Sequence, residues 1–525
     1  MRSLELKLKP EEALDEERLM HTIDQKIGAG ANYRIKRRSI DARKKQVKVN
    51  VLVEIFEGAI PDKVTYTIPQ NNVANANQAI VVGSGPAGLF AALRLIEYGI
   101  KPIVIERGKD VRARRRDLAA INKDHVVNED SNYCFGEGGA GTYSDGKLYT
   151  RSKKRGDIQR VLEILVTHGA TDQILYDAHP HIGTNKLPKV VAALRDSIIA
   201  AGGEVMFESR VVDVLINGDE IKGVKLSDGL EVKGEGVILA TGHSARDIFH
   251  LLHEKKVKIE SKPFALGVRI EHPQQLIDQI QYNCGSSRGD YLPASSYALV
   301  NQSVYQQVQR GVFSFCMCPG GFIVPAATSP GEVVVNGMSP SRRDSKYANS
   351  GIVVAVNEDD LKDYHQLGPL AALQFQADVE QAACKIAGNT QAAPAQRLVD
   401  FVNNKVSTSL PDTSYQPGLC SVQMGEVLPQ FISESLKQGF KQFGKKMKGY
   451  YTNEAQIVGV ESRTSSPVRI PRNKESLEHV EVKKLFPCGE GAGYAGGIVS
   501  AAMDGERCAE ALVKKCFAKN YKDSI

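Results

Sequence analysis

The residues best suited to carry chemistry in this 525-residue chain form one glycine-rich turn, Gly83-Ser84-Gly85-Pro86-Ala87-Gly88. The turn follows the apolar run AIVV and opens the helix-like segment AGLFAALRLIEYG, and the next apolar run ends at Glu106. Gly83 permits a tight turn, Gly85 lets the backbone approach a pyrophosphate, and Gly88 allows close helix–strand packing. Because Glu106 can also accept from ribose hydroxyls, the pattern predicts dinucleotide binding rather than a plain β-α-β unit.

Three later segments carry further glycine motifs: FGEGGAGTYSDGKLYT at 135–150, VILATG at 237–242 and LFPCGEGAGYAGGIVSAAMDG at 485–505. With HIGTNKL, ILATGHSARD, FCMCPGG and NGMSPSRR, they resemble flavoproteins with two dinucleotide-binding domains. More narrowly, the sequence resembles the glutathione-reductase-like group, and within it the bacterial family of uncharacterised FAD-dependent dehydrogenases, also described as NAD(P)/FAD-dependent oxidoreductases. It extends over most of the chain.

The resemblance implies that FAD is held by segments scattered along the sequence. Glu106 would bind the adenosine ribose, residues 138–142 the pyrophosphate and ribityl chain, and Val211 and Val212 the adenine. Glu490 stands where an aspartate is commoner and would bind the ribityl hydroxyls. The implied cofactor-binding residues are Gly83, Ser84, Gly85, Pro86, Ala87, Gly88, Glu106, Arg107, Gly138, Gly139, Ala140, Gly141, Thr142, Val211, Val212, Thr241, Gly242, Gly489, Glu490, Gly496, Gly497 and Ile498.

The helix that we expect from Ile498 would point its N-terminus at the flavin pyrimidine edge, where negative charge accumulates on reduction. No second dinucleotide motif follows in the sequence, so we expect no dedicated NAD(P)H-binding domain. Either the substrate itself delivers the hydride, or NAD(P)H acts as a diffusible reductant.

Two cysteines, Cys316 and Cys318, precede a Pro-Gly-Gly turn. On a regular strand both thiols would lie on one face, with Cα atoms about 6.5–7 Å apart, which disfavours a disulfide between them. The alternatives are one reactive thiol near the flavin or plain packing. We expect Cys318, next to the turn, to be the more accessible of the two.

Two other side chains are weak catalytic candidates. His243 follows the ATG segment, and Arg343 could clamp an anion, although a structural histidine and a surface ion pair are the simpler interpretations. No cluster has metal-ligand spacing, so we predict no metal. Basic residues are concentrated at 34–48 and at 112–116. The first run indicates either a surface for RNA or an acidic partner, or a solvated strand face. The second indicates either an ordinary helix or an approach to the cofactor phosphates.

The pattern of elements predicts an α/β protein with a discontinuous Rossmann-like FAD-binding domain and an inserted, mixed β/α substrate domain. We predict a small N-terminal α/β module over 1–70, FAD-binding segments over 78–261 and 461–525, and the insert over 262–460. Helices are expected at 157–168, 186–200, 369–387 and 498–515. Residues 262–430 otherwise show no simple period.

The composition limits the classes of protein to which the chain can belong. There are 67 basic and 61 acidic residues, a net charge of +6 that is too mild to indicate nucleic-acid binding. The nine cysteines lack framework spacing, which indicates reduced thiols, and no run approaches the length of a membrane helix. The motifs and the resemblance, together with this composition, predict a cytoplasmic FAD-dependent oxidoreductase that transfers hydride between flavin N5 and an unidentified small organic substrate. Alternatives are an RNA-associated flavoprotein that modifies nucleotides and a reductase of unsaturated, isoprenoid-like substrates.

Overall fold

The computed structural model describes residues 2–28, 30–150 and 155–517. The predicted segments 1–70, 78–261 and 461–525 each include a few residues outside this set. At the centre is a parallel five-stranded sheet, which confirms the predicted Rossmann-like class. Its strands, in spatial order, are β22 (Leu485–Pro487), β10 (Val237–Leu239), β4 (Gln78–Val82), β5 (Lys101–Ile105) and β6 (Glu204–Met206).

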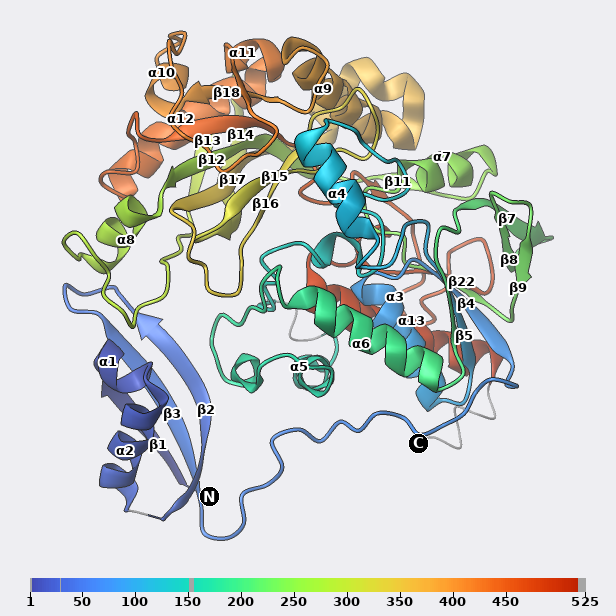
Figure 1. The fold of residues 1–525 in the computed structure, drawn as a ribbon. Helices are drawn as coiled ribbons and strands as arrows, with labels where there is room; N and C mark the ends of the chain where they lie inside the picture. Colours follow the sequence, from blue (N-terminus) through green and yellow to red (C-terminus); the bar gives the residue numbers. More distant parts are fainter. Residues whose placement is uncertain (1, 29, 151–154, 518–525) are drawn as a thin grey trace.

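Both faces of this sheet are covered, which explains why its strands are continuously apolar. Ala79 and Val81 of β4 pack beneath the helices, whereas Ile80 and Val82 pack on the opposite face. The helical layer contains α3 (Pro86–Glu97), α5 (Ile158–Thr167), α6 (Leu187–Ala200) and α13 (Ile498–Cys516) (Figure 1). The other layer contains α7 (Arg246–Glu254) and a sheet of β7 (Val211–Asn217), β8 (Glu220–Leu226) and β9 (Glu231–Lys233).

A second, seven-stranded sheet occupies the segment without a simple sequence period. Its order is β13 (Val300–Tyr305), β14 (Val308–Cys318), β17 (Tyr347–Val356), β12 (Phe264–Pro273), β20 (Gln456–Glu461), β18 (Ala393–Arg397) and β19 (Leu419–Ser421), antiparallel except for the last pair. Leu266, Val268 and Ile270 of β12 pack into one core with Leu436 and Phe440 of α12 (Gln430–Lys446). The alternate residues Arg269 and Glu271 of β12 are buried and polar.

Further elements surround the seven-stranded sheet. They are α8 (Gln274–Tyr282), α9 (Ala371–Ile386), α10 (Leu398–Val402), α11 (Met424–Val427) and the hairpin β15 (Phe322–Pro325)–β16 (Val335–Met338). The hairpin packs against α4 (Arg114–Lys123), and the short pair β11 (Glu260–Ser261)–β21 (Val468–Arg469) lies where the chain crosses between the two large sheets. These contacts hold the two sheets together around the glycine loops.

The N-terminal module has the order β1 (Arg2–Leu8), β3 (Lys48–Phe56), β2 (Asn32–Asp41), with α1 (Pro10–Ala13) and α2 (Glu16–Ile27) on one face. In Figure 1 it stands to one side and joins the rest through a long extended segment. Four of its basic side chains form ion pairs within the chain: Arg34 and Lys36 with Glu54, Arg38 with Asp177, and Arg43 with Asp41. The four expected helices are confirmed, and none of the helices in the described ranges has the length and apolarity to cross a bilayer.

Candidate cofactor-binding and active site

The three glycines of the turn between β4 and α3 each meet a different environment. Gly83 has φ +104, a left-handed conformation that glycine adopts without strain. A Cβ on Gly88 would overlap the carbonyl oxygen of Gly83, so the helix packs against the strand only with glycine there. A Cβ on Gly85 would meet no atom within 4 Å. Gly85 therefore borders open space at the start of α3, where a pyrophosphate can approach.

Two long helices begin at glycines and converge on one turn. Gly85 is the N-cap of α3 and Gly497 the N-cap of α13; neither helix has a side-chain cap or an acidic residue in its first turn. A Cβ on Gly141 would lie 3.3 Å from Ile498 and 3.5 Å from Pro86, the first residues of the two helices. Two sets of free N–H groups thus meet at the short 3-10 turn Gly139–Gly141, which favours a bound anion there.

A buried arginine supports this second glycine loop. Arg114 is fully buried, and its guanidinium donates to the carbonyls of Asn132 (2.7 Å), Glu137 (2.9 Å) and Gly139 (3.0 Å). Among the described residues its Nη2 has no hydrogen-bond partner, and burial lowers the pKa of Arg114. The sequence indicated residues 112–116 as a basic run but did not distinguish its arginines. Arg114 is the one that lies beneath the second glycine loop.

Glu106 joins three loops of the site. Its carboxylate accepts from the Ser84 amide (3.0 Å) and hydroxyl (2.7 Å), and from the amides of Gly108 (2.9 Å) and Gly136 (3.0 Å). A carboxylate has about four acceptor positions, and these bonds use all of them. The geometry therefore assigns Glu106 a role in fixing the turn, and a ribose contact remains a prediction. The neighbouring Arg107 pairs with Asp130 and Asp247.

The ATG segment and the C-terminal loop lie against each other. A Cβ on Gly491 would crowd the carbonyl of Gly242, and the Thr241 hydroxyl is buried with no partner among the described residues. His243 Nε2 lies 3.7 Å from a carboxylate oxygen of Glu490. Burial lowers the pKa of His243 below its ordinary value, although Glu490 opposes the shift. The imidazole is thus neutral near pH 7 and able to exchange a proton with a neighbour.

The remaining implied cofactor residues differ in their contacts and burial. Gly489 donates its amide to Asp504 (2.8 Å), and the amide of Gly496 donates to Ser500 (3.1 Å). Gly138 donates to the Ser84 carbonyl (2.9 Å), and the Thr142 hydroxyl donates to the carbonyl of Glu137. Val211 is buried, whereas Val212 is exposed where the β7–β8 register shifts. The turn, the second glycine loop, the ATG segment and the C-terminal loop come together; the adenine role of Val211 and Val212 remains a prediction.

The expectation that Cys318 is the more accessible of the two thiols was wrong. Cys318 is 1% exposed, and it is Cys316 that is exposed. The register of β14 shifts between Phe315 and Cys318, and Cys316 takes a φ of +45, so the two residues do not alternate as on a regular strand. Lys147 donates to the Met317 carbonyl in the same bulge. Arg343 forms a two-bond ion pair with Asp145, so its guanidinium is committed within the chain.

We expect alkylation of the folded protein to modify Cys316 at least about tenfold faster than Cys318, because a buried thiol reacts only after local opening. Iodoacetamide labelling followed by peptide mass mapping measures both rates in one sample. Cys316→Ser should remove the fast label and leave the slow one unchanged. Faster labelling of Cys318 would contradict this description of the bulge.

A buried network of charges, which no sequence pattern indicated, connects the two large sheets. Arg246, three residues after His243, binds Glu332 and Glu380 at 2.7 Å each. Arg463 binds the same two carboxylates at 2.9 Å each. Although burial alone would raise it, the two arginines hold the pKa of Glu380 at about 2. The pairing fixes the seven-stranded sheet against the loop that carries His243.

A second cluster lies behind the C-terminal loop. Cys488, Asp504 and Cys508 are buried, with potential ligand atoms within 4.8 Å of one another. The Arg472 guanidinium pairs with Asp504 (2.6 Å) and contacts the Cys508 sulfur (3.2 Å). The charge of the carboxylate is therefore balanced by Arg472 within the chain.

These features fit FAD: open space at Gly85, an unpartnered Thr241 hydroxyl and two glycine-capped helix starts around one turn. Three sequence families match the chain. They are described as "FAD-dependent protein, C-terminal domain-like" over residues 263–464, "FAD binding domain" over 76–120, and a domain of unknown function (DUF8436) over 1–56.

An uncharacterised protein of Clostridium beijerinckii is 42% identical over 497 residues, covering 91% of this chain and 92% of that protein. A digeranylgeranylglycerophospholipid reductase of Methanosarcina acetivorans is 26% identical, over 31% of this chain and 37% of that protein. A solved geranylgeranyl bacteriochlorophyll reductase-like structure from Thermoplasma acidophilum is 13% identical, covers 85% of this chain and 80% of its own, and has a TM-score of 0.33. The chain therefore belongs, with the Clostridium protein, to the family of FAD-dependent proteins with this C-terminal domain, and it is an FAD-binding oxidoreductase.

Proposed function

We propose that this oxidoreductase transfers hydride between the flavin and a small or medium-sized organic substrate. The observation that carries the proposal is the meeting of α3 and α13 at the Gly139–Gly141 turn. FAD supplies a two-electron centre whose N5 accepts or donates hydride. The seven-stranded sheet, held to this site through Arg246 and Arg463, supplies the substrate side.

The chain's own residues then have distinct tasks. The N-terminus of α3 at Gly85 would bind the diphosphate, and that of α13 at Gly497 would stabilise negative charge on the pyrimidine edge. Glu490, on the loop before α13, would accept from the ribityl hydroxyls. The two helix N-termini have no side-chain cap, so little rearrangement is needed there on binding.

His243 is the residue that we propose for proton transfer to or from the substrate. It lies next to Glu490, and burial keeps its imidazole neutral near pH 7, as a proton acceptor must be. Cys316 and Lys147 are substrate-contact candidates, because the strand bulge brings an exposed thiol and an ammonium group together. Cys318 is buried and Arg343 is paired, which makes both poorer candidates.

The two alternative functions receive less support. A reductase of isoprenoid-like substrates, the activity named for the Methanosarcina relative, would require an apolar cavity, whereas the cavity at the end of β12 and the start of α8 is lined mainly by polar and charged residues. An RNA-modifying flavoprotein would need free cations at 34–48, and four of them pair with carboxylates. We propose that NAD(P)H, if it is the reductant, docks without a Rossmann unit of its own.

Anaerobic mixing of the yellow protein with NADH, NADPH and candidate metabolites tests the proposal. At least one of them is expected to bleach the flavin absorption in a saturable manner. His243→Asn should slow bleaching by a proton-coupled substrate about 100-fold, the lower range for a general acid or base, while FAD content stays unchanged. Bleaching by none of the compounds, with chemically reducible FAD bound, would contradict hydride transfer.

A further inference from the structure

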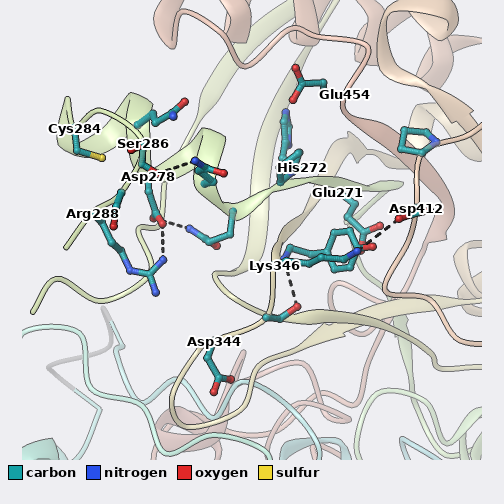
Figure 2. Close-up of a pocket in the computed structure, with 18 of the residues that line it drawn as sticks. Glu271, His272, Asp278, Cys284, Ser286, Arg288, Asp344, Lys346, Asp412 and Glu454 are labelled. Carbon is teal, nitrogen blue, oxygen red and sulfur yellow. Dashed lines mark hydrogen bonds and ion pairs between the residues drawn. The ribbon is translucent and has the colours of Figure 1, made fainter. Parts of the chain in front are cut away.

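A cavity of about 660 Å³ lies at the end of β12 and the start of α8, and it shares no residue with the glycine loops (Figure 2). This volume falls in the range of small-molecule sites, roughly 300–1,000 Å³, and is too large for a metal ion alone. Five carboxylates line it, from Glu271, Asp278, Asp344, Asp412 and Glu454, against two cations, Arg288 and Lys346. The protein as a whole is net positive, so this negative lining opposes its overall charge.

Neither of the two cations pairs with Glu271, the most buried of the five carboxylates. Arg288 is committed to Asp278 at 2.6 Å, and Lys346 lies 3.6 Å from Asp412 at the exposed rim, as Figure 2 shows. Glu271 is 2% exposed and accepts from the amide and the hydroxyl of Ser414 and from Gln456 Nε2 (3.2 Å), all of them neutral donors. No ion pair to Glu271 occurs among the described residues, and burial raises the pKa of its carboxyl.

Two neighbouring acceptors, unlike Glu271, have no hydrogen-bond partner among the described residues. Gln456 Nε2 donates to Glu271 and to the Asp412 carbonyl (3.1 Å), which fixes the orientation of the amide; its Oε1 has no partner in the described structure. His272 donates Nε2–H to the Tyr450 carbonyl (2.8 Å), so Nδ1 is an acceptor, and it too is unpartnered. Burial lowers the pKa of His272 to about 4, so the ring is neutral at pH 7. Both residues line the cavity and are 1% exposed.

An anionic and acceptor-rich wall selects a ligand with positive charge and several N–H donors, because buried acceptors without donors are costly. We propose that this cavity binds a small organic cation, an amine or guanidinium compound, separately from the FAD site. Glu271 faces its charged group at depth, and Glu454 faces it at the mouth. The proposal does not depend on which substrate the flavin reduces.

Isothermal titration of the FAD-loaded protein with spermidine and with agmatine tests this site, with glutarate as an anionic comparator. At least one amine should bind saturably and glutarate should not. Glu271→Gln should weaken amine binding about tenfold or more, and the exposed Glu454→Gln, which cannot disturb the core, about threefold. Glu57→Gln, an exposed carboxylate outside the cavity, is the matched control and should bind like the wild type.

Two outcomes would overturn the proposal: neither amine binds at millimolar concentration, or amine binding is as strong in both cavity variants as in Glu57→Gln. FAD content and flavin bleaching are recorded on the same samples. If the wild type binds an amine but its flavin is not reduced by any compound, the result counts against the proposed function only. If a cavity variant loses amine binding and keeps flavin reduction, the two sites are separate.

Discussion

Substituting Gly85 by valine is expected to give a folded protein that retains no FAD. The backbone of Gly85 has φ −70 and ψ −178, an extended conformation that valine adopts readily. Its Cβ would meet no atom of the chain within 4 Å, so the fold has room for the side chain. The same room lies at the N-terminus of α3, where the diphosphate must approach the backbone. The isopropyl group therefore excludes the cofactor without straining the protein.

Gly88→Ala is the matched comparison, because its Cβ would overlap the Gly83 carbonyl and force the helix from the strand. We expect it to lose stability as well as FAD. Flavin absorbance per chain and circular dichroism, measured on both variants after reconstitution with excess FAD, separate the two effects. A Gly85→Val protein that holds FAD as tightly as the wild type would show that the diphosphate lies elsewhere.

Replacing Arg463 by methionine is expected to lower the free energy of unfolding by about 3–5 kcal/mol, because removing one partner of a buried ion pair leaves the other uncompensated. Arg463 is 6% exposed, and its guanidinium also donates to Thr328 at 2.7 Å. Without it, Glu332 and Glu380 share Arg246 alone, so two buried carboxylates face one cation. Chemical denaturation monitored by tyrosine fluorescence measures the change.

Arg43→Met serves as its control. Arg43 pairs with Asp41 at the surface, where the side chain is 86% exposed, and an exposed pair of this kind contributes little to stability. The control is expected to unfold like the wild type. If Arg463→Met unfolds at the same denaturant concentration as Arg43→Met, the buried network does not hold the two sheets together.

The parallel sheet and the helices around it were predictable because local signals agree with the fold. The run of Ala79–Val82, the turn at Gly83–Gly88 and the helix from Ile498 each follow from residue type and spacing. The family resemblance extended the prediction to the other glycine loops that converge on the turn. Glycine positions reveal a cofactor loop in sequence because the backbone, and not the side chain, makes the contact.

The seven-stranded sheet was harder to predict from the sequence. Its inner strands β12 and β17 are buried nearly throughout, so they lack the alternation that marks a half-exposed strand. The bulge that turns Cys316 outward has no local sequence signal, and the prediction for the thiols failed there. The network of Arg246, Glu332, Glu380 and Arg463 joins positions far apart in sequence, and only the tertiary fold brings them together.

Identification of the cofactor released by acid from the purified protein tests the central claim most directly. Chromatography against standards is expected to give FAD, one per chain after reconstitution, because the turn at Gly83–Gly88 is built for a pyrophosphate that FMN lacks. Recovery of FMN alone, or of no flavin after incubation with FAD, would contradict the account.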